Sequence, residues 1–193
     1  MPKISASSVV EHRELRRQQL MEAAITLAIQ GGAHTIRVSA VAAKAGLARS
    51  SVYEYFNSSA DLIAELIIQE LDYYSERLAK AISEVSDPFE KIEKWIAEGL
   101  RYVADGRHML VKSLNTIDTP DNRKEEISVG HRRLMAPLRS AIVETKVKDP
   151  KMAGVFLQSI TDAASMRIDA GSDAQEEINS ATAFALAGLR ALI

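Results

Sequence analysis

The chain is 193 residues long, with 24 Lys and Arg against 26 Asp and Glu, no Cys and 47% hydrophobic residues. This length and apolar content allow a buried core and exclude a disordered or collagen-like chain. No apolar run approaches the roughly 20 residues of a membrane-spanning helix, and without Cys there are no disulfides, thiol catalysis or Cys-ligated metal sites. We therefore expect a cytoplasmic protein with no membrane partner, no cofactor and no metal site.

The net charge of −2 is a sum over two unlike regions of the chain. Residues 1–60 hold seven Lys and Arg against four Glu, a charge of +3, whereas the remaining 133 residues hold 17 basic and 22 acidic residues, a charge of −5. A basic N-terminal region on an acidic remainder favours a polyanionic partner that binds at the basic end. Because many unrelated domains show a charge difference of this size, the motifs must decide.

Helical periodicity runs through nearly the whole chain, and no segment alternates as a strand does. The pattern predicts a first helix over 13–30 that ends at Gly31-Gly32, because glycine readily takes the left-handed conformation. Two short helices follow at about 38–45 and 48–55, and a long helix runs from about 59 to 86. Further helices are expected at 88–105, 108–116, 123–147, 150–170 and after Asp173, with Asp87, Asp149 and either Ser172 or Asp173 as N-caps. The predicted fold class is all-α, with about nine helices.

Residues 38–56 have the pattern of a helix-turn-helix. Two short helices that cross steeply need a small residue before the bend, here Ala42, and positive φ at the bend, here Gly46. The expected core positions are Val41, Ala45, Leu47, Val52 and Phe56, and the outward positions are Arg49, Ser50, Ser51, Tyr53, Glu54 and Tyr55. An ordinary helical hairpin would share this core pattern. The outward Arg, Ser and Tyr favour DNA, because these groups bind phosphates and base edges.

These residues resemble the TetR family of bacterial transcriptional regulators. The resemblance rests on Gln19–Leu27, Val41–Phe56 and Asn57–Leu62, and it covers roughly residues 13–66. It implies a three-helix DNA-binding domain over residues 1–57 and a helical effector-binding and dimerisation domain over residues 58–193. The expected DNA-binding residues are Arg37, Ser39, Lys44, Arg49, Ser50, Ser51, Tyr53, Tyr55 and Ser59.

Three positions depart from the family pattern. Arg37 stands where a Thr or Ser usually leads into the second helix, so a phosphate contact from Arg37 would replace one from a hydroxyl. Ala48 replaces the usual Ser or Thr cap of the third helix, which costs about 1 kcal/mol of local stability. Ser59 replaces a Lys, which removes a phosphate-binding charge and should make DNA binding depend less steeply on salt.

The last two helices alternate small residues with large apolar ones. The final helix is apolar on much of its circumference, which implies burial on more than one side. With the family resemblance, this predicts a homodimer through a four-helix interface, with two recognition helices about one DNA turn, roughly 34 Å, apart on a near-palindromic operator. The expected interface residues are Phe156, Leu157, Ile160, Ala164, Ala181, Ala185, Leu189 and Leu192.

The effector site has a weaker signature. On the helix over 123–147, His131 lies in a stripe of apolar residues, as either a core residue or a ligand contact. Pro137 removes a backbone hydrogen bond and can open space between helices. Trp95 and Tyr102 share a face with Gly99, as either core packing or the wall of a flat ligand site. The expected effector-binding residues are Trp95, Tyr102, His131, Leu134 and Met135.

The sequence therefore predicts a homodimeric, sequence-specific regulator of transcription that binds double-stranded DNA and is not an enzyme. A repressor released from its operator by a small-molecule effector is the expected mode. Two alternatives remain open, a TetR-like DNA-binding protein that acts without an effector, as an architectural protein or activator, and an all-α ligand carrier. The four His show no metal-ligand spacing, and no Gly-rich phosphate loop is present.

Overall fold

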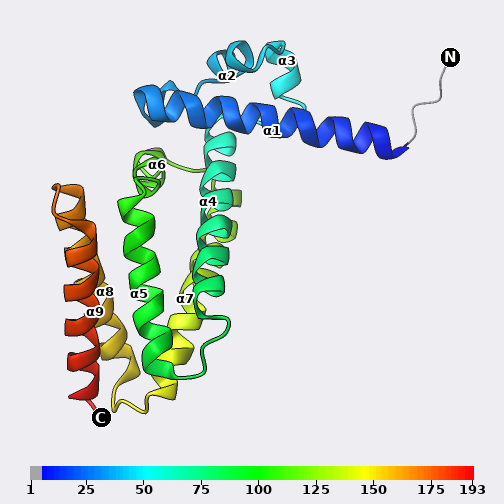
Figure 1. Ribbon diagram of the computed structural model, residues 1–193. Helices are drawn as coiled ribbons and strands as arrows, with labels where there is room; N and C mark the ends of the chain where they lie inside the picture. The colour runs from blue at the N-terminus through cyan, green and yellow to red at the C-terminus, as the bar shows by residue number, and fades with distance from the viewer. Residues whose placement is uncertain (1–5) are drawn as a thin grey trace. The chain divides into compact units, whose positions relative to one another are not determined.

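The computed structural model describes residues 6–193, which form nine α-helices, one short 3-10 helix and no strand (Figure 1). The elements in chain order are α1 (Ala6–Gly31), η1 (Ala33–Thr35), α2 (Val38–Ala45), α3 (Arg49–Val52), α4 (Ser59–Ile82), α5 (Pro88–Ala104), α6 (His108–Leu114), α7 (Asp121–Glu144), α8 (Pro150–Asp169) and α9 (Ala174–Arg190). The predicted all-α class is confirmed. None of these helices is long and apolar enough to cross a membrane.

The helices group into two compact units. The first unit extends to Gln69 and adds Leu110–Ile127, and the second comprises Glu70–Met109 and Ser128–Ile193. The chain therefore passes from one unit to the other inside α4, α6 and α7.

In the first unit, α2 packs against α1 and α3 packs against α2 (Figure 1). Leu20 of α1, Val41 of α2 and Val52 of α3 are all completely buried. The bend between α2 and α3 falls at Gly46, which has a φ of 68° and therefore lies in the left-handed region that glycine occupies without a Cβ penalty. The predicted small residue Ala42 is buried at the crossing, and its carbonyl accepts a hydrogen bond that closes the end of α2.

In the second unit, α5, α8 and α9 lie side by side (Figure 1). The predicted N-caps are confirmed, because the carboxylates of Asp87, Asp149 and Asp173 each accept the backbone N–H three residues later, at 2.8, 2.9 and 2.8 Å. Asp173, and not Ser172, caps α9. These bonds satisfy N–H groups that the first turn of a helix leaves without a partner.

The bounds of several helices differ from the prediction, since α4 ends at Ile82 and not near 86, and α7 ends at Glu144 and not at 147. α1 begins at Ala6 and not at Arg13, because the apolar periodicity marks only the part of the helix that contacts the core. α3 ends at Val52, and the chain continues as turns to Tyr55, where the prediction had a helix to 55. Its first residue is preceded by Ala48, which makes no side-chain cap bond, as expected. Two predicted core positions, Ala45 and Leu47, are only half-buried, and η1 was not predicted.

Candidate functional site

The segment from Arg37, the residue before α2, to Ser59, the first residue of α4, carries all nine residues predicted to bind DNA and is called the recognition segment. Six of their side chains are exposed and three are half-buried. The exposed residues are Arg37, Ser39, Lys44, Arg49, Ser50 and Tyr53, and the half-buried residues are Ser51, Tyr55 and Ser59. All nine belong to the first unit, so the fold brings them together on one compact body.

The outward face of α3 is fixed by an anchor on its inward face. Val52 is completely buried and Phe56 is 3% exposed, which holds this short helix against the unit. On the outward side, Nη2 of Arg49 donates a hydrogen bond to Oη of Tyr53 at 3.2 Å, and the guanidinium lies 5.8 Å from the centre of that ring. Arg presents a planar set of donors that matches phosphates and the acceptor edge of guanine. The exposed face of α3 therefore has the chemistry of a base-reading helix.

Ser59 performs a structural task at the start of α2. Its Oγ accepts a hydrogen bond from the backbone N–H of Val38 at 3.2 Å. The residue before α2, Arg37, makes no side-chain cap bond and stays exposed. The Ser59 hydroxyl at the start of α4 thus takes the place of the missing Thr or Ser before α2. The sequence did not reveal this hydrogen bond, because Val38 and Ser59 lie 21 positions apart.

Acidic residues of α4 fix the end of the recognition segment. Oδ2 of Asp61 accepts hydrogen bonds from both the backbone N–H and the side-chain amide of Asn57, at 2.9 and 3.1 Å. One turn later, Glu65 pairs with Arg17 of α1 and Arg123 of α7. All of these contacts lie within the first unit, so they hold α1, α4 and the start of α7 together beneath the recognition segment. No sequence signal pointed to them, because i, i+4 carboxylates usually face solvent.

An apolar surface covers α8 and α9 in the second unit. The side chains of Phe156 and Phe184 are 51% and 71% exposed, and a largely apolar hollow of about 390 Å³ lies among these residues and Leu189. The predicted interface residues divide into two groups here. Leu157, Ala164, Ala181, Ala185 and Leu189 are buried within the chain itself, whereas Phe156 is exposed and Ile160 and Leu192 are half-buried. Phe184, which is not among the predicted interface residues, is more exposed than Phe156.

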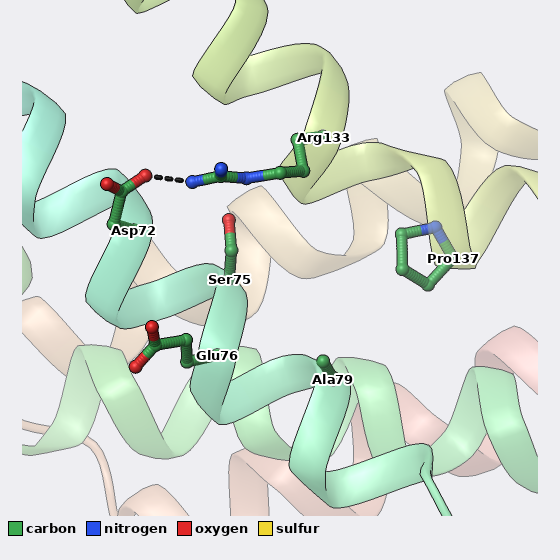
Figure 2. Close-up of a pocket in the computed structure, with 6 residues that line it drawn as sticks. All are labelled: Asp72, Ser75, Glu76, Ala79, Arg133 and Pro137. Carbon is green, nitrogen blue, oxygen red and sulfur yellow. Dashed lines mark hydrogen bonds and ion pairs between the residues drawn. The ribbon is translucent and has the colours of Figure 1, made fainter.

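A second hollow, of about 370 Å³, lies between α4 and α7 in the second unit (Figure 2). Asp72 of α4 and Arg133 of α7 form an ion pair across it, and their side chains are 49% and 58% exposed. The hydroxyl of Ser75 is buried without a hydrogen-bond partner among the described residues. Pro137, which the sequence predicted would open space between helices, lines this hollow together with Glu76 and Ala79. Across residues 6–193, no group of three or more His, Asp or Glu side chains is placed to hold a metal ion.

The five predicted effector residues do not line this hollow. Trp95, Tyr102 and Leu134 are buried, Met135 is half-buried and His131 is exposed. Of the two alternatives for His131, the core residue is wrong, because α7 turns Leu134 inward and His131 outward. The α7 residues that do line the hollow, Arg133 and Pro137, are neighbours of the predicted ones.

The face of α5 that carries Gly99 is filled by packing. The rings of Tyr74 and Tyr102 stack with their centres 4.2 Å apart, and a Cβ placed on Gly99 would lie 2.8 Å from Oη of Tyr74. Oε2 of the buried Glu70 accepts a hydrogen bond from Tyr102 at 3.3 Å, and Arg107 donates two more to this carboxylate, at 2.9 and 2.7 Å. Burial, together with the nearby Glu98 carboxylate, raises the pKa of Tyr74 to about 12. Of the two alternatives for this face, the structure supports core packing.

Comparison with known proteins gives a family match for residues 20–66 and a shared fold over 89% of the chain. Residues 20–66 match the family model of bacterial regulatory proteins of the tetR family. The chain is 24% identical over 102 residues to the fatty acid metabolism regulator protein of Bacillus subtilis (strain 168), covering 53% of each protein. It is 31% identical over 98 residues to the uncharacterized HTH-type transcriptional regulator YfiR of the same organism, covering 49% of this chain and 47% of that protein.

The chain thus spans about half the length of the curated relatives it matches. Among solved structures, the transcriptional regulator FadR from Bacillus subtilis in complex with stearoyl-CoA aligns with a TM-score of 0.73 at 21% identity. That alignment covers 89% of this chain and 98% of the other. It shows that the two chains share their fold.

Proposed function

Because the chain belongs to the TetR family of bacterial regulatory proteins, we propose that it is a homodimeric, sequence-specific regulator of transcription that acts on DNA in the bacterial cytoplasm. The observation that carries this proposal is that Arg49 and Ser50 of α3, and Tyr53 directly after it, are exposed while Val52 anchors the helix in the core. In a helix-turn-helix, the second helix lies in the major groove and its first residues reach base edges. We assign DNA binding to residues 1–57, and effector binding and dimerisation to residues 58–193.

A gel-shift series on a fragment of the DNA upstream of its own gene tests this assignment. The unmodified protein should shift the fragment, and Arg49→Ala or Tyr55→Phe should weaken binding. Loss of a bidentate Arg contact corresponds to about 1–3 kcal/mol, or roughly 5- to 150-fold in affinity. Lys151→Gln, which removes an exposed cation on α8, is the matched control for the change in charge. If Arg49→Ala and Tyr55→Phe both bind as the unmodified protein does, the assigned roles are wrong.

The apolar surface of α8 and α9 supports the homodimer. Phe156 and Phe184 stand beside an apolar hollow, so a second copy related by a two-fold axis would cover both rings and fill the hollow. Phe184→Glu should convert the dimer to a monomer in sedimentation velocity. Val143→Glu replaces an apolar side chain of α7 that is 61% exposed and should leave the dimer intact. A Phe184→Glu protein that remains dimeric would place the interface elsewhere.

We further propose that a small-molecule effector releases this regulator, as a repressor, from its operator. A fatty acyl-CoA is the first candidate, because one relative is a fatty acid metabolism regulator and a protein of the same fold was solved with stearoyl-CoA. The hollow between α4 and α7 is lined by one cation, Arg133, and by the carboxylates of Asp72 and Glu76, so an anionic group of the effector would bind Arg133 by displacing Asp72. Release requires that the effector prefer a conformation in which the two DNA-binding units are wrongly spaced for the operator.

Substitutions of Asp72 and of Arg133 test the effector site, because they should change the affinity for stearoyl-CoA in opposite directions. Arg133→Gln should weaken the binding of stearoyl-CoA in calorimetry, whereas Asp72→Asn should strengthen it, because the guanidinium loses its competing carboxylate. Stearoyl-CoA should also abolish the gel shift. A shift that stearoyl-CoA does not change favours the effector-independent regulator, and a chain that binds stearoyl-CoA but no DNA is the ligand carrier.

A further inference from the structure

The first turns of α1 carry cations that the helix-turn-helix does not include. The family match begins at residue 20, whereas α1 begins at Ala6. In Figure 1 the dark-blue first turns of α1 run out past α3, and both helices belong to the first unit. Arg13 and Arg16 lie on these turns, with Arg13 exposed and Arg16 half-buried.

Helical spacing places both arginines on the side of α1 that faces its own unit. Arg13 and Arg16 continue the row formed by Leu20 and Ala24, because positions three or four residues apart share a helix face. Leu20 and Ala24 are both completely buried in the first unit. N-terminal to Leu20, the same face of α1 therefore carries the guanidinium groups of Arg13 and Arg16 in place of buried apolar side chains.

Among the residues that the structure describes, no carboxylate neutralises these two guanidinium groups. Arg17, their neighbour, pairs with Glu14 and with Glu65. Neither Arg13 nor Arg16 pairs with a carboxylate of residues 6–193, in contrast to Arg17. The acidic residues of this stretch lie on a different row, where Glu14 and Glu22 are exposed.

Arg13 also adjoins the recognition segment. Its guanidinium lies 5.9 Å from the centre of the Tyr55 ring, which follows α3. This contact resembles the one between Arg49 and Tyr53 on α3, at 5.8 Å. A ring that carries a guanidinium on its face holds that group in place without removing its hydrogen-bond donors. The cationic row of α1 is thus continuous with the surface proposed to read DNA.

We propose that Arg13 and Arg16 bind phosphates of the DNA that flanks the base pairs contacted by α3. The inference rests on the proposed DNA-binding function and lengthens the DNA site beyond α2 and α3. Guanidinium groups match phosphate oxygens through paired hydrogen bonds. Contacts of this kind position a protein on the duplex and carry no sequence information, so they add affinity and salt dependence but not base preference.

The salt dependence of operator binding tests this proposal on the full chain. Arg13→Gln/Arg16→Gln should lower the slope of log K against log salt by about 0.9 for each phosphate that is no longer bound, hence by about 1.8 for each DNA-binding unit. The preference for the operator over an unrelated duplex should stay as in the unmodified protein. Arg139→Gln/Lys151→Gln removes two exposed cations from the second unit and should leave the slope unchanged. Arg13→Lys/Arg16→Lys should retain most of the slope.

The outcomes separate this inference from the proposed function. An unmodified protein that shows no preference for its upstream DNA would overturn both. Specific binding whose slope is the same in Arg13→Gln/Arg16→Gln and in the control would overturn only the role of α1. Hydroxyl-radical footprints supply a second measurement, because the substitution should shorten the protected stretch at its outer edges. Circular dichroism confirms that the variant is folded, and Arg16→Gln alone, with half the slope change, replaces the double variant if it is not.

Discussion

Gly99 of α5 packs so closely against Tyr74 in the second unit that even a methyl side chain would clash there. A Cβ at this position would meet Oη of Tyr74 at 2.8 Å, closer than real Cβ contacts come. The Tyr74 ring cannot easily withdraw, because it stacks on Tyr102 at 4.2 Å with an angle of 15° between the planes. We therefore expect Gly99→Ala to force a shift of the stacked pair.

Two opposing terms set the size of the effect. Overpacking a core costs about 1–3 kcal/mol. Alanine favours the helix interior over glycine by about 1 kcal/mol. Gly99→Ala should therefore lower the free energy of unfolding by about 0–2 kcal/mol. In a Tyr74→Phe background the clashing oxygen is gone, so the same substitution should raise the free energy of unfolding by about 1 kcal/mol.

Urea unfolding followed by far-UV circular dichroism measures all four proteins of this double-mutant cycle at one protein concentration. The expected coupling between the two positions is about 1–3 kcal/mol, which is the overpacking term alone. Additive effects, with Gly99→Ala equally harmful with and without the Tyr74 hydroxyl, would refute the packing argument. The space beside Gly99 would then be open to a flat ligand, as one alternative from the sequence had it.

The remaining predictions concern pH and helix ends. The folded-state pKa of Tyr74, about 12, lies above its ordinary value of 10.0, so its contribution to stability is complete below pH 10.0 and is lost as the pH rises towards 12. In a titration followed by tyrosinate absorbance, the step that Tyr74→Phe removes should therefore lie near pH 12. If the substitution instead removes a step near pH 10.0, the pKa of Tyr74 is not raised. Ala48→Ser should raise the free energy of unfolding by about 0.5–1 kcal/mol by supplying the absent cap of α3, read from urea unfolding. Asp149→Ala should lower the melting temperature through a loss of about 1 kcal/mol, and Asp149→Ser should restore most of it.

The fold was readable from the sequence where local chemistry sets the structure. Asp87 and Asp149 each precede a proline, and both cap helices as their sequence patterns predicted. Gly46 bends the chain as its position between two short apolar segments required. The early start of α1 was not readable, because the residues just before Arg13, such as Val10, are exposed and so do not continue the buried apolar row. α3 is short and lacks a side-chain cap at Ala48, and Val52 is the buried residue within its bounds.

The candidate sites could also be predicted from the sequence only where they depend on residues that are close together in the chain. The recognition segment lies within a short stretch, so its inward and outward faces follow from spacing alone. The hollow between α4 and α7 depends on which helices pack together, and Asp72 and Arg133 are 61 positions apart. Apolar stripes point to the inward faces of helices, which explains why they selected the buried Trp95 and Leu134 as effector residues.

The separation of charge around α1 affects how this protein would meet DNA. Arg13 and Arg16 lie on one side of the helix, and Glu14 and Glu22 lie on another, so the helix has a transverse dipole with little net charge. Near a polyanion such a dipole experiences a torque that turns its cationic side towards the duplex before contact. Correct orientation during approach raises the fraction of productive collisions at low salt. A chain with a net charge of −2 would thereby find DNA quickly without adhering to every polyanion it encounters.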